Sequence, residues 1–278
     1  MANHVSDKVV VVTGAASGFG RLVSEKIAAL GGKVVCADVN EAGLEAVVAG
    51  ISSAGGTAVA STVDVTSAQQ MHALAGFAVE KFGAIDVMVN NAGVMPLAFY
   101  TDHEEALAAW ERCIDINIKG VLYGMVAVQA QMLEQGHGHI VNLSSIYGNF
   151  PVVGAGVYGA SKAAVNFLSE SMRMESQGRI KVTIVKPTGV PGTALGQGVV
   201  NPDAVVGILG HNAAAYGQLM QAYQSGDLPA EYTDAKSIEY CVLAPEHLAE
   251  QIVYAINQPW GVSIGEVTVR ASGDAYIL

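Results

Sequence analysis

The chain has 278 residues, of which 51% are hydrophobic and 14% charged, and this composition excludes a disordered or fibrous protein and allows one large buried core. Its 25 acidic residues against 14 Lys and Arg give a net charge of −11, which would repel the phosphates of a nucleic acid. No stretch approaches the roughly 20 consecutive apolar residues of a membrane helix, so we expect neither a nucleic acid nor a membrane as partner.

The polar start and the cysteines both favour a cytoplasmic protein. Residues Met1 to Lys8 lack the apolar stretch of a secretory signal. Cys36, Cys113 and Cys241 lie far apart, without a C-x-x-C pair or a histidine cluster at metal-ligand spacing. We interpret them as small buried hydrophobes in a reducing compartment, and we expect no metal site.

Short apolar runs alternate along the chain with longer segments of helical period, as in repeated βαβ units around a parallel sheet. The expected strands are Val9–Thr13, Lys33–Ala37, Thr57–Thr62, Ile85–Val89, His139–Leu143, Lys181–Val185 and Glu266–Arg270. The expected helices are Phe19–Leu30, Glu41–Ser53, Ser67–Phe82, Glu104–Gln135, Val157–Gln177 and Pro245–Asn257. The pattern predicts an α/β fold: a Rossmann-like, doubly wound, seven-stranded parallel sheet in a single domain over residues 1–278.

No strand is expected between Pro187 and Ala244. This stretch reads as a long loop with one or two helices, including one across Asn201–Ser225.

The first expected strand runs into Thr13-Gly14-Ala15-Ala16-Ser17-Gly18-Phe19-Gly20 and then a helix. Glycines at such a turn let the backbone approach a pyrophosphate, and amides at the helix start can hold the anion. The spacing is not G-x-G-x-x-G, and a glycine turn before a helix can also be purely structural.

Asp38 follows the second strand, where an acidic side chain can accept hydrogen bonds from the adenosine ribose. Its charge would repel a 2′-phosphate, and neither Ala15, Ala16, Val39 nor Asn40 supplies a cation. The sequence therefore favours NAD(H) over NADP(H), the alternative being a solvated turn aspartate.

Tyr158 and Lys162 are spaced i, i+4 on a helical segment, so they share one face. A free tyrosine has a pKa near ~10, and a neighbouring ammonium lowers it toward useful acid–base chemistry. Ser144 and Ser145 end the fifth strand, at the sheet edge where open α/β folds bind ligands, and one hydroxyl can donate to a substrate oxygen. An exposed helix face and capping serines are the structural alternatives.

Together these motifs resemble the short-chain dehydrogenase/reductase family from Lys8 to about Val190, because Asp64-Val65, Asn90-Asn91-Ala92-Gly93, Asn117 and Tyr158-Gly159-Ala160-Ser161-Lys162 follow in family order. The resemblance implies Tyr158 as catalytic acid/base, Ser145 as carbonyl-orienting donor, and Lys162 as a cation beside Tyr158 and a ribose ligand. It implies that Asn117 holds a water for proton relay; a helix-kink asparagine is the alternative.

The resemblance also implies the cofactor contacts, with Asn90 bracing neighbouring strands. They are Gly14, Ser17, Gly18, Phe19, Gly20, Asp38, Val39, Asp64, Val65, Asn91, Ala92, Gly93, Tyr158, Lys162, Pro187, Gly189 and Val190. One departure follows the sixth strand, where Thr188 stands at a family glycine position and Thr193 comes one residue late, which leaves Thr193 outside the expected contacts.

The expected reaction transfers a hydride between NAD(H) and a small-molecule secondary alcohol or ketone. The resemblance also implies that residues from about 188 to 244 form a helical substrate lid. Apolar residues of this lid favour a bulky hydrophobic substrate, or else they pack on the protein: Leu195, Val199, Leu209, Tyr216, Leu219, Met220 and Tyr223. Weaker candidates for pocket walls are Met95, Ile146, Tyr147, Phe150 and Val153.

Family members commonly pair through the two long helices, so we expect a homodimer or homotetramer. Two other functions stay open: an NADPH-dependent biosynthetic ketoreductase, and a non-catalytic regulator that binds NAD.

Overall fold

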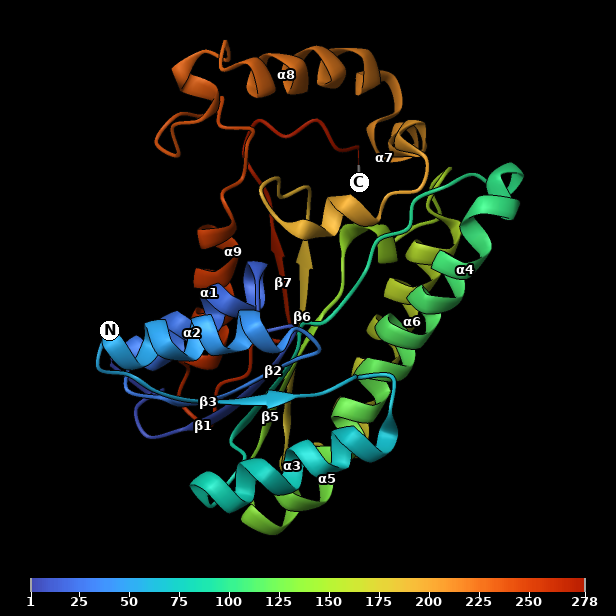
Figure 1. Ribbon diagram of the computed structural model, residues 1–278. Helices are drawn as coiled ribbons and strands as arrows, with labels where there is room; N and C mark the ends of the chain where they lie inside the picture. Colours follow the sequence, from blue (N-terminus) through green and yellow to red (C-terminus); the bar gives the residue numbers. More distant parts are fainter. Residues whose placement is uncertain (1, 278) are drawn as a thin grey trace.

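The computed structural model describes residues 2–277 and contains a parallel sheet of seven strands in the order β3-β2-β1-β4-β5-β6-β7 (Figure 1). The strands are β1 (Val9–Thr13), β2 (Lys33–Asp38), β3 (Thr57–Thr62), β4 (Val87–Asn90), β5 (His139–Leu143), β6 (Lys181–Pro187) and β7 (Glu266–Val269). The expected fold class is confirmed.

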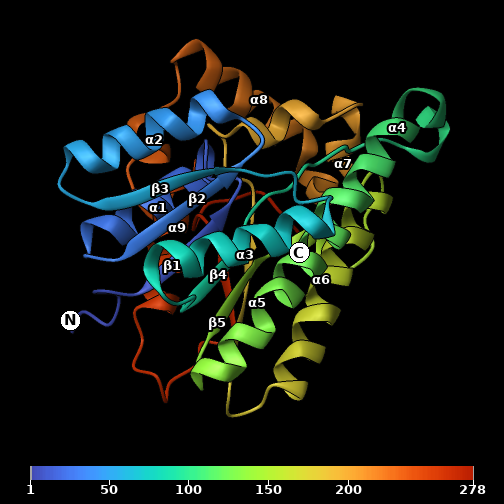
Figure 2. The ribbon, with the colours of Figure 1, turned by 60° about the horizontal axis from the view of Figure 1, so that its bottom comes forward.

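Two helical layers cover the sheet (Figures 1 and 2). One layer contains α1 (Gly18–Ala29), α2 (Glu41–Ser53) and α9 (Pro245–Ile256). The other contains α3 (Ala68–Phe82), α5 (Val121–Gln135) and α6 (Gly156–Glu175), and α4 (His103–Cys113) leads into α5. No helix within the described residues is long and apolar enough to cross a membrane.

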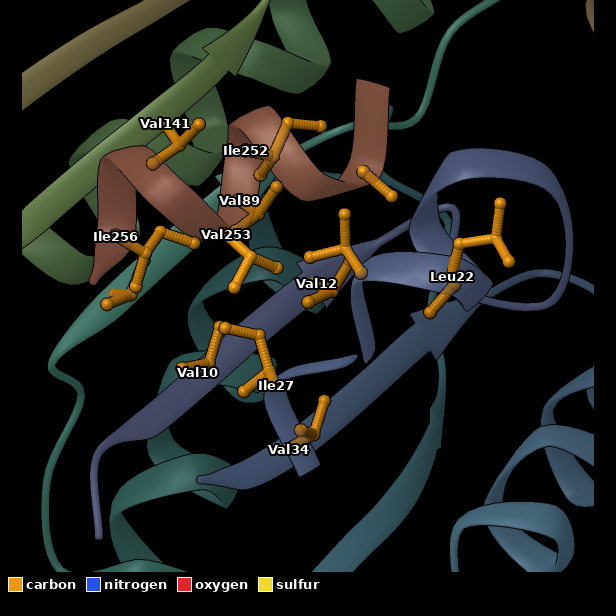
Figure 3. Packing of buried hydrophobic residues seen from close by; sticks show 14 of the residues in the cluster. Val10, Val12, Leu22, Ile27, Val34, Val89, Val141, Ile252, Val253 and Ile256 are labelled. Atoms are coloured by element: carbon orange, nitrogen blue, oxygen red, sulfur yellow. The ribbon is translucent and has the colours of Figure 1, made fainter. Parts of the chain in front are cut away.

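The strands are continuous apolar runs because both faces of the sheet are buried. Successive side chains of β1 point to opposite layers: Val10 and Val12 pack with α1 and α9, whereas Val11 packs with the α3–α5–α6 layer. Figure 3 shows the first of these cores, where Ile27 of α1 and Ile252 of α9 lie over the strands.

The chain reverses its direction of winding at the centre of the sheet. Strand β1 pairs with β2 on one side and with β4 on the other, so successive crossovers leave the sheet centre in opposite directions. The carboxyl ends of these strands therefore border a crevice, which is where doubly wound sheets bind ligands.

Two expected helices are interrupted, and those expectations were wrong in detail. Within Glu104–Gln135, a π-helical turn at Ile114–Gly120 separates α4 from α5. Within Asn201–Ser225, short 3-10 turns and α7 (Val206–Leu209) precede α8 (Ala213–Ser225). The break falls at Gly210, whose φ of +54° is a conformation that a helix cannot contain.

Candidate active site

A cleft of about 670 Å³ runs along the carboxyl ends of the strands, within the size range of small-molecule sites. The predicted residues that line it are Gly14, Ser17, Gly18, Phe19, Asp38, Val39, Asp64, Val65, Asn91, Ala92, Gly93, Tyr158, Lys162 and Pro187. Residues that are far apart in the sequence thus meet at one crevice.

The glycine turn leaves no room for side chains. A Cβ added to Gly20 would lie 2.2 Å from the Gly14 carbonyl oxygen, and one added to Gly14 would lie 2.8 Å from Asn91 Nδ2. Gly14 also has a positive φ of 66°. Gly20 lets α1 start directly against the turn, while Gly14 and Gly18 line the cleft with bare backbone. The backbone at the helix start is therefore open to an anionic ligand.

Asp38 is fixed to the glycine turn by its carboxylate. Oδ2 accepts a hydrogen bond of 3.1 Å from the Ala16 amide, and Oδ1 accepts one of 3.0 Å from the Asn40 amide. The carboxylate lines the cleft at the end of β2. The two backbone donors hold an acidic group at the end of the cleft formed by β2 and β3.

The asparagines after β4 connect neighbouring strands. Asn91 Nδ2 donates to the carbonyl of Thr13 at 2.8 Å, which joins the loop after β4 to the end of β1. Asn90 is buried and its Nδ2 donates to Asn142 Oδ1 of β5 at 2.8 Å, the bracing role expected for it. These bonds keep the floor of the cleft together.

Tyr158 and Lys162 line the cleft, and Ser145, which does not line it, lies within hydrogen-bonding reach of Tyr158. All three are buried, with 3%, 5% and 6% of their surfaces exposed. Lys162 Nζ lies 5.7 Å from the centre of the Tyr158 ring and donates to the carbonyl of Leu143 at 2.9 Å. Ser144 is occupied differently, because its hydroxyl donates to the Lys162 carbonyl at 3.1 Å. Ser145 is thus the serine directed at Tyr158.

Burial dominates the electrostatics of these groups. It lowers the pKa of the Lys162 ammonium to about 8. It also raises the pKa of the Tyr158 phenol, and the hydrogen bond with Ser145 lowers that pKa by less. The loss of hydration is thus the largest influence on the pKa of Tyr158, and the role of Lys162 in lowering that pKa stays a prediction. The phenol is protonated at neutral pH.

Asn117 lies at the centre of the π-helical turn with its side chain fully engaged. Nδ2 donates to the Val94 carbonyl at 2.9 Å and to Ser161 Oγ at 3.0 Å, while Oδ1 accepts from the Val94 amide at 3.0 Å. The amide therefore joins the loop after β4 to α6, next to Lys162. Single π turns of this kind are frequent at functional sites.

Of the three expected cofactor contacts at the end of β6 and in the loop after it, only the first lines the cleft. Pro187 lines the cleft, whereas Gly189 packs against the phenol of Tyr276 and Val190 packs with Tyr240 and Ala271. Thr188 continues the pairing with β7 through its amide, which donates to the Val269 carbonyl at 3.2 Å. Thr193 does line the cleft.

Several residues near the cleft were not identified from the sequence. Glu111, Arg112 and Asp115 line it from α4 and the π-helical turn, and a polar stripe at helical spacing was their only signal. Tyr276 lies beyond the part of the chain that carries the family motifs. Among the pocket-wall candidates, Ile146 and Tyr147 are buried with Tyr158, while Phe150 and Val153 are mostly exposed.

Comparisons with known proteins show the family of this chain. Residues 8–203 match the family described as short chain dehydrogenase. An uncharacterized oxidoreductase of Staphylococcus saprophyticus is 35% identical over 96% of this chain and 98% of its own. A short chain dehydrogenase/reductase of Burkholderia phymatum in complex with NAD is 31% identical, with a TM-score of 0.74 over 96% of this chain and 90% of its own. The closed form of a serine dehydrogenase complexed with NADP+ is 27% identical, with a TM-score of 0.76 over 97% of both chains. The chain belongs to the short-chain dehydrogenase/reductase family.

Proposed function

We propose that the protein is an NAD(H)-dependent oxidoreductase that interconverts a secondary alcohol and a ketone. The observation that carries the proposal is the burial of Tyr158, Ser145 and Lys162 together beside the cleft. A protein that only binds a nucleotide has no use for a buried phenol, hydroxyl and ammonium grouped in this way. Structures similar to this one are described in complex with NAD and with NADP+, which supports a nicotinamide cofactor.

The residues of the cleft fit such a dinucleotide. The bare backbone of Gly14 and Gly18 at the start of α1 would hold the pyrophosphate, and Asp38 would accept hydrogen bonds from the adenosine ribose. The carboxylate disfavours a 2′-phosphate, and this repulsion supports NAD(H) over NADP(H). Bound there, the nicotinamide would supply or accept the hydride.

Tyr158 donates the proton in reduction and accepts it in oxidation. In reduction the neutral phenol gives its proton to the carbonyl oxygen, while Ser145 donates a hydrogen bond that orients this oxygen. In oxidation the phenol must first be deprotonated before it can accept the proton of the alcohol. Since burial raises the pKa of Tyr158, oxidation should accelerate as the pH rises, whereas the phenol stays protonated and able to serve reduction throughout. Lys162, whose pKa is about 8, adds positive charge beside the ring below that pH.

The side chains around Tyr158 support an apolar substrate. Leu97, Ile146, Tyr147, Ile208 and Leu209 form one buried cluster with it. Apolar surroundings of this kind beside the proposed proton donor favour alkyl or aryl groups on the reacting carbon.

The decisive experiment replaces Tyr158 by Phe and follows absorbance of the reduced nicotinamide, with NAD+ or NADP+ and a panel of aliphatic, aryl and alicyclic secondary alcohols. The substitution removes the proton donor, so kcat should fall about 10²–10⁴-fold. Binding of NAD+, measured by calorimetry, should be retained. Tyr254→Phe on α9, where the tyrosine is 43% exposed, is the matched control. Equal rates for wild type and Tyr158→Phe would refute the mechanism; no turnover by wild type that binds NAD+ would favour a regulator.

A further inference from the structure

The segment after β7 folds back over the active site. Arg270 forms an ion pair with Asp274 at 2.6 Å and donates to the carbonyl of Tyr276 at 2.8 Å. Farther along, the Ile277 amide donates to the Ile208 carbonyl at 3.0 Å. We call residues 271–277 the tail. Figure 1 shows it running between the end of β7 and the α7–α8 region.

The tail is also joined to the start of α8. Asn212 Nδ2 donates to the Ala275 carbonyl at 2.9 Å. A Cβ added to Gly210 would lie 2.8 Å from Ile277 Cδ1, so the tail packs closely on the turn between α7 and α8. The tail and the α7–α8 segment therefore form one unit above the sheet.

Tyr276 extends from the tail to the loop after β6. A Cβ added to Gly189 would lie 1.6 Å from the Tyr276 hydroxyl oxygen, so the phenol lies directly on the bare backbone of Gly189. Its ring is tilted against that of Tyr216 of α8, with 5.9 Å between the ring centres. The tail thereby places the Tyr276 phenol beside Gly189, two residues after Pro187, which lines the cleft.

The hydroxyls of Tyr276 and Tyr216 have an unused donor. They lie 3.3 Å apart, and within residues 2–277 each forms its only side-chain hydrogen bond with the other. Two hydroxyls share one hydrogen, so one O–H remains without an acceptor. Burial raises the pKa of the Tyr276 phenol, and nearby Tyr216 and Tyr147 act in the same direction, so the proton stays in place. Both tyrosines are only partly buried, so this O–H is free to donate to a ligand oxygen.

This hydroxyl pair belongs to the apolar cluster of the active site. Tyr147 packs edge-on against the Tyr158 ring, with 5.4 Å between the ring centres, and the cluster continues to Tyr216 and Tyr276. Leu209 and Ile208 lie in the same cluster. Apolar side chains thus lie between the Tyr158 ring and the two hydroxyls.

We propose that the substrate carries a hydrogen-bond acceptor distant from its reacting carbon, and that the hydroxyls of Tyr276 and Tyr216 bind this acceptor. Tyr276 is then a specificity-determining residue supplied by the tail. The proposal rests on the alcohol–ketone function given above. It narrows the substrate class from any bulky apolar alcohol to an apolar alcohol or ketone with a second oxygen, such as an amide or ketone carbonyl.

The test compares methyl phenyl carbinol with the same carbinol bearing a para carboxamide, and a second pair in which biphenyl replaces phenyl. Wild type should prefer a carboxamide in kcat/KM by about tenfold, the effect of one hydrogen bond of about 1.4 kcal/mol. In Tyr276→Phe and Tyr216→Phe this preference should fall toward one. Tyr254→Phe should retain it, and thermal unfolding of every variant checks that the fold is intact.

The two proposals fail in different ways. Turnover of the carbinols with the same carboxamide preference in wild type and Tyr276→Phe, or with no preference in wild type, would overturn the role of the hydroxyl pair and leave the oxidoreductase function standing. If no carbinol is oxidised, the proposed function fails. Calorimetry of the corresponding ketones with the protein and NADH then decides the inference: tighter binding of the carboxamide that Tyr276→Phe abolishes supports it, and equal affinities refute it.

Discussion

Asp38 combines a structural and an electrostatic role in one carboxylate. Its two oxygens hold the amides of Ala16 and Asn40, so the side chain contributes to the shape of the glycine turn. On the proposed function, its negative charge is the part that would disfavour the 2′-phosphate of NADP(H). The two roles can be separated by changing the charge while keeping an oxygen acceptor.

We therefore predict different results for two substitutions at this position. Asp38→Asn keeps one acceptor for the turn and removes the charge, so the ratio of kcat/KM for NADP+ over NAD+ should rise about tenfold, equivalent to 1.4 kcal/mol. Asp38→Ala should relax the discrimination too and should also weaken NAD+ binding, because both hydrogen-bond acceptors are lost. Steady-state kinetics with both cofactors measure the ratio. An unchanged ratio in both variants would favour the NADPH-dependent reductase.

Strands β5 and β6 are joined by a buried histidine as well as by their backbones. His139 Nε2 lies 2.8 Å from Thr183 Oγ1, which itself donates to the Ile264 carbonyl. Since the threonine hydrogen is used, Nε2 must carry the proton of a neutral imidazole. Burial lowers the pKa of His139 to about 3, and the nearby ammonium groups of Lys181 and Lys8 act in the same direction.

This histidine should make the fold sensitive to mild acid. The unfolded chain binds a proton at His139 near pH 6.5 and the folded protein only near pH 3, so stability falls as the pH decreases between these values. One such group contributes a slope of up to about 1.4 kcal/mol per pH unit. Urea unfolding across this range should show a smaller slope for His139→Gln than for wild type. The exposed His211→Gln should behave like wild type; equal slopes in all three proteins would contradict the assignment.

The elements differ in how well the sequence predicts them. Valine runs such as Val9–Thr13 are unambiguous, because a strand buried on both faces needs a continuous apolar sequence. The π-helical turn around Asn117 is not visible in the hydrophobic pattern, because its cause is a set of hydrogen bonds to Val94 and Ser161. Motif order placed Tyr158, Ser145 and Lys162 at one site, whereas the path of Gly189 depends on Tyr276, which no local pattern connects to it.

At the scale of the whole molecule, the layer of α4, α5 and α6 exposes large apolar side chains. On α6, Phe167 is 78% exposed. Met174, which lies two turns later on the same helical face, is 65% exposed. Leu107 of α4 and Val126 of α5 are also exposed. Such side chains on neighbouring helices support the expected association of two or four copies through this layer.

We predict that Phe167→Glu reduces the oligomeric state. A glutamate placed between subunits would be buried without a partner, whereas on a free surface it would be tolerated. Light scattering coupled to size-exclusion chromatography should show a smaller species than wild type. Ile238→Glu, at an equally exposed residue of the loop after α8, should leave the mass unchanged. A mass unaffected by Phe167→Glu would exclude this layer as the essential contact.

The contact between Gly189 and Tyr276 joins two distant parts of the chain by steric exclusion. Neither position can change freely: a side chain gained at 189 requires a smaller residue at 276, and a lineage that loses the phenol no longer needs the glycine. In an alignment of close homologues these two columns should therefore vary together, and the subset that keeps both residues should mark the enzymes that share one substrate preference.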